Sequence, residues 1–352
     1  MTQPQRIEAK TGFSAVAGEN RFPVDLAVML KRKRIVAYGA GMALEQTQTA
    51  MPLAIEYAVD TSPEMNGRSV AGIAVYAPER LLSERGDDVL IVVYANTPQA
   101  IAGISETLNR MGFVWGQHYI DCSLLHFESM RETLRARLGI EASVDRFVRA
   151  RVLSMYLGIE AHSQIAGNWL VTELMEACCA RTEGDIAECG VYKGGSAIIS
   201  LLGCERATRR PYHLLDSFEG FSELSAFDPA VRRADFQDVE YAKIVAMFRN
   251  YPNVRIHRGY FDDTLPGLGV EQFSMVYADC DLYEPTLRLC EHFYKRVASG
   301  GCMLFHDYWV PEEDLQHRPV FRGVYKAVNE FVGSNRERLV VFPETTHAVL
   351  MA

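Results

Sequence analysis

An apolar run that ends in an acid and then breaks into glycines is the first feature with chemical potential. Glu188 lies near the end of the run, Gly190 follows it, and the pair Gly194-Gly195 precedes a helical pattern that begins at Ser196. A strand, a glycine turn and a helix N-terminus bring backbone N–H groups against a nucleotide-like ligand. The early acid and the late glycine pair favour a cofactor with an amino-acid tail and a ribose, which indicates S-adenosylmethionine. A purely structural turn would also explain the glycines.

Further acids and a histidine stand at the ends of later apolar runs. Asp216 ends the second run, Asp279 and Asp281 follow the fourth, and His306-Asp307 ends the fifth. Because ligands of an open α/β sheet bind at the carboxyl ends of its strands, we expect these side chains to converge. Asp216 stands where a carboxylate can accept both ribose hydroxyls. A solvated loop acid at 216, a helix-capping Asp281 and a core histidine at 306 remain alternatives.

The acids at the fourth and fifth strand ends are of a type that suits a divalent cation. Oxygen-rich clusters bind Mg²⁺ or Mn²⁺, whereas unpaired carboxylates this close would repel one another. A cation would offset that repulsion and lower the pKa of a bound hydroxyl, so that a nearby carboxylate could remove its proton. The pattern therefore predicts a metal-assisted site.

The elements that must position these groups occupy residues 184–352. Seven apolar runs are typical of strands and span 185–191, 212–216, 254–257, 273–279, 302–307, 339–342 and 348–351. A helical pattern at 284–297 and a glycine-rich turn at 299–301 precede the fifth run. The short connection between the last two runs predicts a hairpin that closes a mostly parallel sheet with an antiparallel last strand. This is the α/β layout expected of class I methyltransferases.

A smaller α/β pattern occupies the first third of the chain. Strand patterns alternate there with helical ones in the order of a doubly wound fold. Gly39-x-Gly41 is followed by Asp60 after 21 residues, as in the dinucleotide fingerprint, but Leu44 replaces the third glycine. Binding of NAD, of another nucleotide or of a nucleotide sugar therefore stays open beside a domain without a ligand.

Three helical patterns lie between the two α/β patterns, with apolar residues three and four apart. We therefore expect an N-terminal arm at 1–20, a Rossmann-like domain at 21–125, a helical connector at 126–183 and a methyltransferase domain at 184–352.

The composition limits the classes of partner. With 352 residues and a net charge of −9, the chain does not favour nucleic acid or an anionic membrane. No apolar run reaches the roughly 20 residues that span a bilayer, and the polar N-terminus predicts no secretory signal. The eight cysteines form no Cys-x-x-Cys pair, which is typical of free thiols in a reducing compartment. We expect a cytoplasmic enzyme that acts on a small-molecule or glycan hydroxyl, with a homo-oligomer possible.

From about residue 160 to 352 the sequence resembles the macrocin-type sugar O-methyltransferases. Four ordered motifs carry the resemblance: Glu-Cys-Gly-Val-Tyr-Lys-Gly-Gly-Ser at 188–196, Leu-Asp-Ser-Phe-Glu-Gly-Phe at 215–221, Gly-Tyr-Phe-Asp-Asp-Thr-Leu-Pro at 259–266 and Asp-Cys-Asp-Leu-Tyr-Glu-Pro-Thr at 279–286. The resemblance implies an S-adenosylmethionine-dependent and Mg²⁺-dependent enzyme that methylates sugar hydroxyls. The extra first domain departs from the compact members of that family.

The resemblance also implies roles for single residues. Asp279 would be a metal ligand and candidate base, and Asp307 would match the second residue of an Asp-Asp pair. His306 replaces the first aspartate of that pair. Imidazole is a poor ligand for Mg²⁺, so the metal is Mn²⁺ or another transition ion, or it is absent and His306 acts as the base. The expected cofactor-binding residues are Glu188, Gly190, Gly194, Gly195, Ser196, Asp216, Ser217 and Phe261, the last packing on adenine.

Two rival functions belong to other classes. In one, the first domain binds NAD and the chain is an oxidoreductase. In the other, the chain is a scaffold in glycan assembly that binds a nucleotide sugar but does no chemistry. The acceptor is also open among an antibiotic sugar, a nucleotide sugar and a surface polysaccharide.

Overall fold

The computed structural model describes Leu26, Leu30 and residues 33–50, 52–95, 97–157, 164–221, 224–229, 231–308, 321–333 and 338–352. The expected N-terminal arm at 1–20 lies outside the described residues. The chain divides into two compact units, 1–128 with 151–158 and 129–150 with 159–352. Within the described ranges, no helix has the length and apolar character needed to cross a bilayer.

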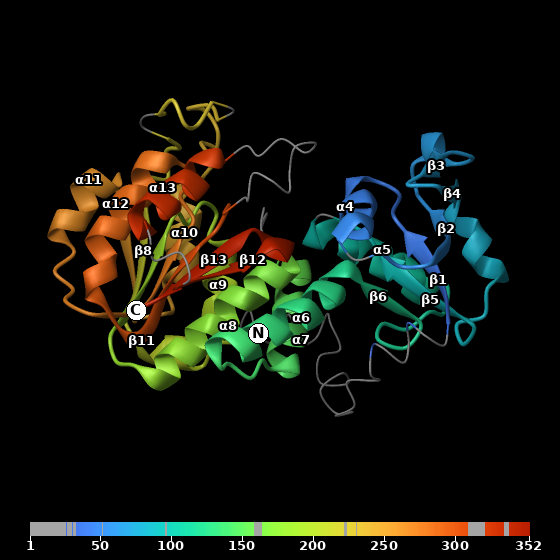
Figure 1. Ribbon diagram of the computed structural model, residues 1–352, viewed down its shortest axis with the longest axis horizontal. Helices are drawn as coiled ribbons and strands as arrows, with labels where there is room; N and C mark the ends of the chain where they lie inside the picture. The colour runs from blue at the N-terminus through green and yellow to red at the C-terminus, as the bar shows by residue number, and fades with distance from the viewer. Residues whose placement is uncertain are drawn as a thin grey trace. The chain divides into compact units, whose positions relative to one another are not determined.

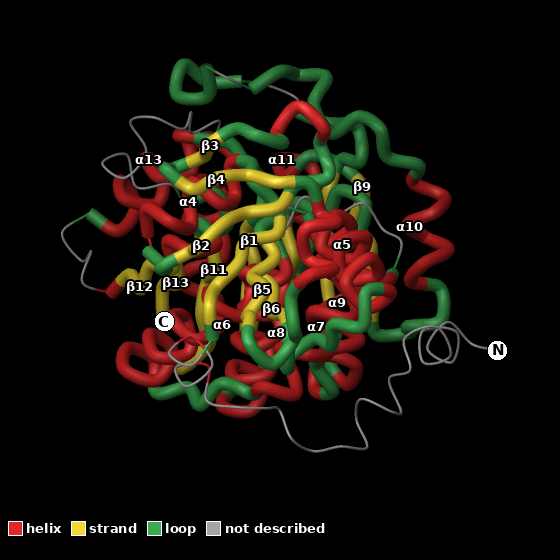
Figure 2. The backbone as a smooth tube through the Cα atoms, turned by 90° about the vertical axis from the view of Figure 1, so that its right-hand side faces the viewer, coloured by secondary structure: helices red, strands yellow, loops and turns green. Residues whose placement is uncertain are grey.

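The first unit is built on a six-stranded sheet in the order β3-β4-β2-β1-β5-β6 (Figure 2). Its strands are β1 Arg34–Tyr38, β2 Ile55–Val59, β3 Ser69–Val70, β4 Ile73–Tyr76, β5 Val89–Val93 and β6 Tyr119–Asp121. Its helices include α4 Met42–Ala50 and α5 Pro98–Arg110, with short 3-10 turns at Pro63–Met65 and Pro78–Ser83. All neighbouring strands are parallel except β3 and β4. The predicted doubly wound pattern is therefore present.

The second unit is built on a seven-stranded sheet in the order β12-β13-β11-β10-β7-β8-β9 (Figure 1). Its strands are β7 Asp185–Cys189, β8 Tyr212–Asp216, β9 Val254–Arg258, β10 Phe273–Ala278, β11 Val297–Phe305, β12 Leu339–Phe342 and β13 His347–Met351. Strand β13 runs antiparallel to both of its neighbours, β11 and β12, whereas the other neighbouring strands pair in parallel. The predicted fold, a mostly parallel sheet closed by an antiparallel last strand, is confirmed.

Helices of the second unit lie on the sheet (Figure 1). Helix α8, Ile165–Arg181, packs on β10 and β11 beside α9, Gly195–Gly203, while α12, Tyr283–Phe293, packs on β10 beside α13, Arg322–Val332. The shorter helices are α10 Tyr241–Phe248 and α11 Phe261–Thr264, with 3-10 turns at Arg206–Arg209, Leu265–Gly267, Tyr294–Arg296 and Pro343–Thr345. Helices α6 Cys122–Thr133, with the π turn Leu134–Leu138 after it, and α7 Val144–Tyr156 precede α8.

The predicted turn at 299–301 is wrong. Strand β11 continues through these residues, and its pairing with β10 shifts register between Phe273 and Met275. Gly300 has a φ of +89°, which glycine adopts without strain. The glycines therefore form a bulge within the strand rather than its boundary.

Helix α8 is buried over most of its length and still contains an acidic side chain. Glu173 is 2% exposed. Its Oε2 accepts hydrogen bonds from Arg146 Nε at 2.9 Å, Trp169 Nε1 at 3.1 Å and the backbone N–H of Ser143 at 3.2 Å. A buried carboxylate with three donors is satisfied, whereas the donors would lose their partner without it.

We predict that Glu173→Ala lowers the free energy of unfolding by about 3 kcal/mol, because the buried indole N–H of Trp169 and two partly buried donors lose this acceptor. Urea unfolding measures the change. The control is Glu132→Ala, which removes an exposed ion pair with Arg135 and should leave the unfolding midpoint unchanged. Equal midpoints for the two variants would contradict this account of α8.

Candidate active site

A cavity of about 540 Å³ opens at the carboxyl edge of the second unit's sheet. Residues that end or follow five different strands line it, among them Gly190, Asp216, Gly259, Asp279 and Asp307. The side chains expected at this edge therefore do converge.

The glycine turn after β7 is shaped by close backbone approach. Gly190 has a φ of +91°, and a Cβ there would lie 1.8 Å from the carbonyl oxygen of Asp279. Gly194 is the N-cap of α9 with a φ of +78°. Gly190, Gly195 and Ser196 line the cavity. The turn therefore requires glycine at 190, and it presents the start of α9 to a ligand.

Glu188 lies beneath this turn. It is fully buried, and its carboxylate accepts hydrogen bonds from Ser196 Oγ at 2.5 Å and from the hydroxyl of Tyr212. Burial raises the pKa of Glu188 to about 7, although both hydroxyl donors act in the opposite direction. In this structure Glu188 positions the helix start rather than lining the cavity.

Asp216 ties the ends of β7 and β8 together. Its Oδ2 accepts from the backbone N–H groups of Val191 at 2.6 Å and Tyr192 at 2.9 Å, and its Oδ1 accepts from that of Phe218 at 2.6 Å. Burial raises the pKa of Asp216, against the effect of these three donors. Because a carboxylate offers about four acceptor positions, a ribose hydroxyl would share this group with the turn.

Two further predicted cofactor residues line the same cavity. Ser217 Oγ donates to the carbonyl oxygen of Gly220 at 2.9 Å and accepts from the backbone N–H of Glu219 at 3.1 Å. Phe261 begins α11 and packs partly against the core of the sheet. Ser217 and Phe261 thus lie on the walls after β8 and β9.

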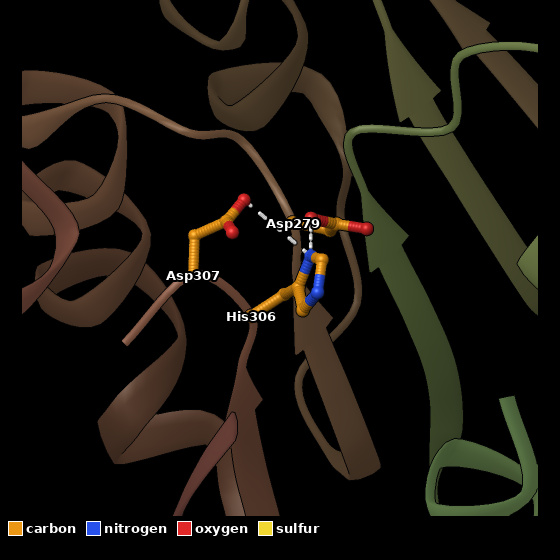
Figure 3. A group of neighbouring side chains, drawn as sticks. All are labelled: Asp279, His306 and Asp307. Atoms are coloured by element: carbon orange, nitrogen blue, oxygen red, sulfur yellow. Dashed lines mark hydrogen bonds and ion pairs between the residues drawn. The ribbon is translucent and has the colours of Figure 1, made fainter. Parts of the chain in front are cut away.

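Asp279, His306 and Asp307 form a compact cluster (Figure 3). His306 Nδ1 lies 2.8 Å from Asp279 Oδ1 and 3.5 Å from Asp307 Oδ2. Each of the three residues offers one potential metal-ligand atom, and these atoms lie within 4.8 Å of one another. Asp307 has a φ of +53°. A non-glycine residue in the left-handed region is costly and is found preferentially at functional sites.

Charge within the cluster is balanced by the imidazole. Burial alone would lower the pKa of His306, but the carboxylates of Asp279 and Asp307 outweigh it and raise this pKa to about 9. Burial would raise the pKa of Asp279, and the neighbouring His306 lowers it instead. The opposite shifts of His306 and Asp279 are those expected of an ion pair between the two side chains.

Tyr277 and His347 support this cluster, and the sequence analysis missed both. The hydroxyl of Tyr277 donates to Asp279 Oδ2 at 3.0 Å. The ring of Tyr277 stacks on that of His347, with 6.0 Å between the ring centroids. The rings of His347 and His306 lie 4.6 Å apart. Burial lowers the pKa of His347 well below its usual range. Tyr277 precedes Asp279 by two positions along a strand and so shares its face, a signal that could have identified it.

Asp281 lines the cavity beside the cluster. Its φ is +65°, and its pKa lies well above the usual range because of burial and of the carboxylates of Asp307 and Asp279. It thus adds a further carboxyl group to this part of the wall.

Comparison with known proteins gives the cavity a family context. Residues 168–331 match the family described as macrocin-O-methyltransferase (TylF). An 8-demethyl-8-(2,3-dimethoxy-alpha-L-rhamnosyl)-tetracenomycin-C 4'-O-methyltransferase of Streptomyces olivaceus is 34% identical over 156 residues, which are 40% of this chain and 59% of that protein. A demethyldecarbamoylnovobiocin O-methyltransferase of Streptomyces niveus is 28% identical over 167 residues, 44% of this chain and 64% of that protein.

The chain thus spans less than two thirds of the length of these relatives. A solved structure, that of the O-methyltransferase NovP, matches 65% of this chain and 98% of its own with 23% sequence identity and a TM-score of 0.44. Residues 168–331, which match the family model, contain the glycine turn, Asp216 and the whole Asp279–His306–Asp307 cluster. Over residues 168–331 the chain is thus similar to the family described as macrocin-O-methyltransferase (TylF).

Proposed function

We propose that the second unit transfers a methyl group from S-adenosylmethionine to a hydroxyl of a sugar in a glycosylated small molecule or a glycan precursor. One observation carries the proposal: the acid–histidine cluster and the family's glycine turn line a single cavity. The names of the two relatives, both O-methyltransferases that act on natural products, support the reaction type.

The donor occupies the half of the cavity formed by the turn and the end of β8. Backbone N–H groups at the start of α9 face the amino-acid tail, and Asp216 accepts from the ribose. Phe261 packs on the adenine. Because the methyl group of a sulfonium is already activated, the main contribution of the protein is to align donor and acceptor.

The acceptor hydroxyl lies against the cluster at the ends of β10 and β11. Asp279 accepts its hydrogen bond, and the hydroxyl oxygen attacks the methyl carbon as the S–C bond breaks. The products are a methyl ether, S-adenosylhomocysteine and a proton, which passes to the Asp279–His306 pair. Tyr277 keeps the carboxylate of Asp279 oriented.

The donor set of the cluster also fits a divalent cation. Two carboxylates and an imidazole offer ligand atoms within 4.8 Å of one another. Asp279, His306 and Asp307 would hold the ion, which would lower the pKa of a bound hydroxyl. Imidazole favours Mn²⁺ or a similar transition ion over Mg²⁺.

The first unit gives little support to an NAD-dependent oxidoreductase. The carboxylate of Asp60 accepts from the backbone N–H groups of Ala40 at 2.7 Å and Ser62 at 2.8 Å, as Asp216 does from its own turn in the second unit, so these bonds favour neither a ligand nor its absence. Leu44 is fully buried where the fingerprint needs a glycine for close helix packing.

We predict that Asp216→Asn weakens binding of S-adenosylhomocysteine about tenfold, because an amide offers one acceptor oxygen instead of two. Isothermal titration calorimetry measures the affinity. Asp60→Asn is the matched control, since Asp60 holds the equivalent turn of the first unit, and it should leave this affinity unchanged. Equal affinities for Asp216→Asn and the wild-type protein would exclude Asp216 from the cofactor site.

We predict that Asp279→Ala lowers turnover by about a hundredfold or more, because the acceptor hydroxyl loses its hydrogen-bond partner and proton acceptor. Affinity for S-adenosylhomocysteine should stay within about twofold, since the donor half is intact. Asp263→Ala, which removes an exposed acid of α11, serves as the control. Wild-type turnover in Asp279→Ala would remove this residue from the mechanism.

We predict that Mn²⁺ affinity rises about tenfold per pH unit from about pH 6 to about pH 9, because the ion must displace the His306 proton, whose pKa is raised to about 9. Electron paramagnetic resonance of free Mn²⁺ measures the affinity without turnover. His306→Asp should flatten the slope and shift preference toward Mg²⁺. Failure to bind Mn²⁺ at every pH would remove the metal from the proposal.

A further inference from the structure

Part of the cavity lining is aromatic and has no role in the mechanism above. Tyr192, Phe221, Phe236 and Phe321, which we call the aromatic wall, all line the cavity. Phe236 is its centre: its ring centroid lies 5.1 Å from that of Tyr192, 5.5 Å from Phe221 and 6.5 Å from Phe321. Three separate segments of the chain thus contribute to one apolar surface.

The wall is held in place by its backbone. Phe236 and Tyr192 have φ values of +62° and +48°, which non-glycine residues rarely adopt. A Cβ on Gly220 would lie 2.7 Å from the carbonyl oxygen of Asp235, so the two ends of the loop after β8 are in contact. Asp238 accepts from the Tyr192 hydroxyl at 2.8 Å and pairs with Lys193 at 2.6 Å. Such strain persists only where the surroundings impose it, as they do around a ligand.

The wall reaches from the donor half to the acceptor half. Tyr192 and Phe221 follow β7 and β8, and Phe236 contacts Phe321 on the acceptor side. Phe321 precedes α13, the helix that follows β11, and β11 leads directly into His306 and Asp307. The adenine side of the proposed site is formed by Phe261, at the end of β9. A ligand between the cluster and the wall would meet carboxylates on one side and aromatic rings on the other.

The charges of the lining limit what such a ligand can carry. Among the described residues that line the cavity, Arg288 is the single lysine or arginine, and it pairs with Asp262. The acids of the lining are Asp216, Asp262, Asp279, Asp281, Glu284 and Asp307. A phosphate group on the acceptor would therefore meet carboxylates, and the described part of the lining offers it no lysine or arginine other than the paired Arg288.

We infer that Phe236 and the aromatic wall determine acceptor specificity by packing on the C–H face of the sugar ring of an uncharged glycoside. The inference rests on the proposed function. A pyranose ring has hydroxyls on its rim and C–H groups on its face, which matches a site with acids on one side and rings on the other. A sugar linked to a nucleoside diphosphate is disfavoured by the charge of the same lining.

The test compares two matched pairs of probes on wild-type protein saturated with S-adenosylhomocysteine. Each pair is a 4-nitrophenyl glycoside and the nucleoside diphosphate derivative of the same sugar, one pair for rhamnose and one for glucose. Titration calorimetry should show at least one glycoside binding roughly tenfold or more tightly than its charged counterpart. Tighter binding of a nucleotide sugar, or no measurable binding of either glycoside at tens of millimolar, would overturn the inference.

Variants of the wall complete the test. Phe236→Ala should weaken glycoside binding roughly tenfold, and Phe236→Tyr should restore most of it because the ring is kept. Phe227→Ala is the matched control, since Phe227 lies in the same loop but contacts Tyr283 and Lys326. Affinity for S-adenosylhomocysteine should persist in all three variants. Unchanged glycoside affinity in Phe236→Ala would refute the role of the wall. If the wild-type protein did not bind S-adenosylhomocysteine at all, the proposed function itself would be refuted.

Discussion

The approach of the glycine turn to the end of β10 is the contact on which the cavity depends. Gly190 lies so close to the backbone of Asp279 that any side chain at 190 would overlap the carbonyl oxygen. The N–H of Asp279 donates to the carbonyl of Cys189 at 2.8 Å, and the N–H of Gly190 donates to that of Leu215 at 2.9 Å. Three strand ends are thereby held at fixed separation. The donor and acceptor halves of the proposed site share this one piece of backbone, so their alignment follows from the sheet itself.

The same device stabilises the corresponding turn in each unit. An acid after the second strand accepts hydrogen bonds from the backbone that follows the first strand: Asp60 from Ala40 N in the first unit and Asp216 from Val191 N in the second. Such an acid is therefore no proof of a ligand, because it has a structural role in either case. The two units differ in the other residues at the carboxyl edge of their sheets. In the second unit the neighbouring strand ends carry the Asp279–His306–Asp307 cluster and line a cavity of about 540 Å³.

The sequence predicted most of the fold because buried parallel strands are continuous apolar runs, and the run at 212–216 matches β8 residue for residue. The apolar run at 339–342 likewise matches β12, which pairs antiparallel with β13. Strands β3 and β6 were missed because two or three residues carry no periodic signal. The bulge at Gly300 was misread because a glycine pair inside a strand has the same composition as a turn. The convergence of the acids could be predicted because they follow parallel strands, whose carboxyl ends meet at one edge of the sheet. The positions of Tyr277, His347 and Phe236 relative to the cavity could not, because they depend on packing between segments far apart in the chain.

The central claim is that this cavity transfers a methyl group to a sugar oxygen. The most direct measurement incubates the protein with S-adenosylmethionine that carries a ¹³C-labelled methyl group and an uncharged glycoside, and follows the label by ¹³C nuclear magnetic resonance. The account predicts a new methoxy carbon on the sugar ring, formed together with S-adenosylhomocysteine. Label that stays on the sulfonium, or that moves to a nitrogen or carbon atom of the acceptor, would contradict it.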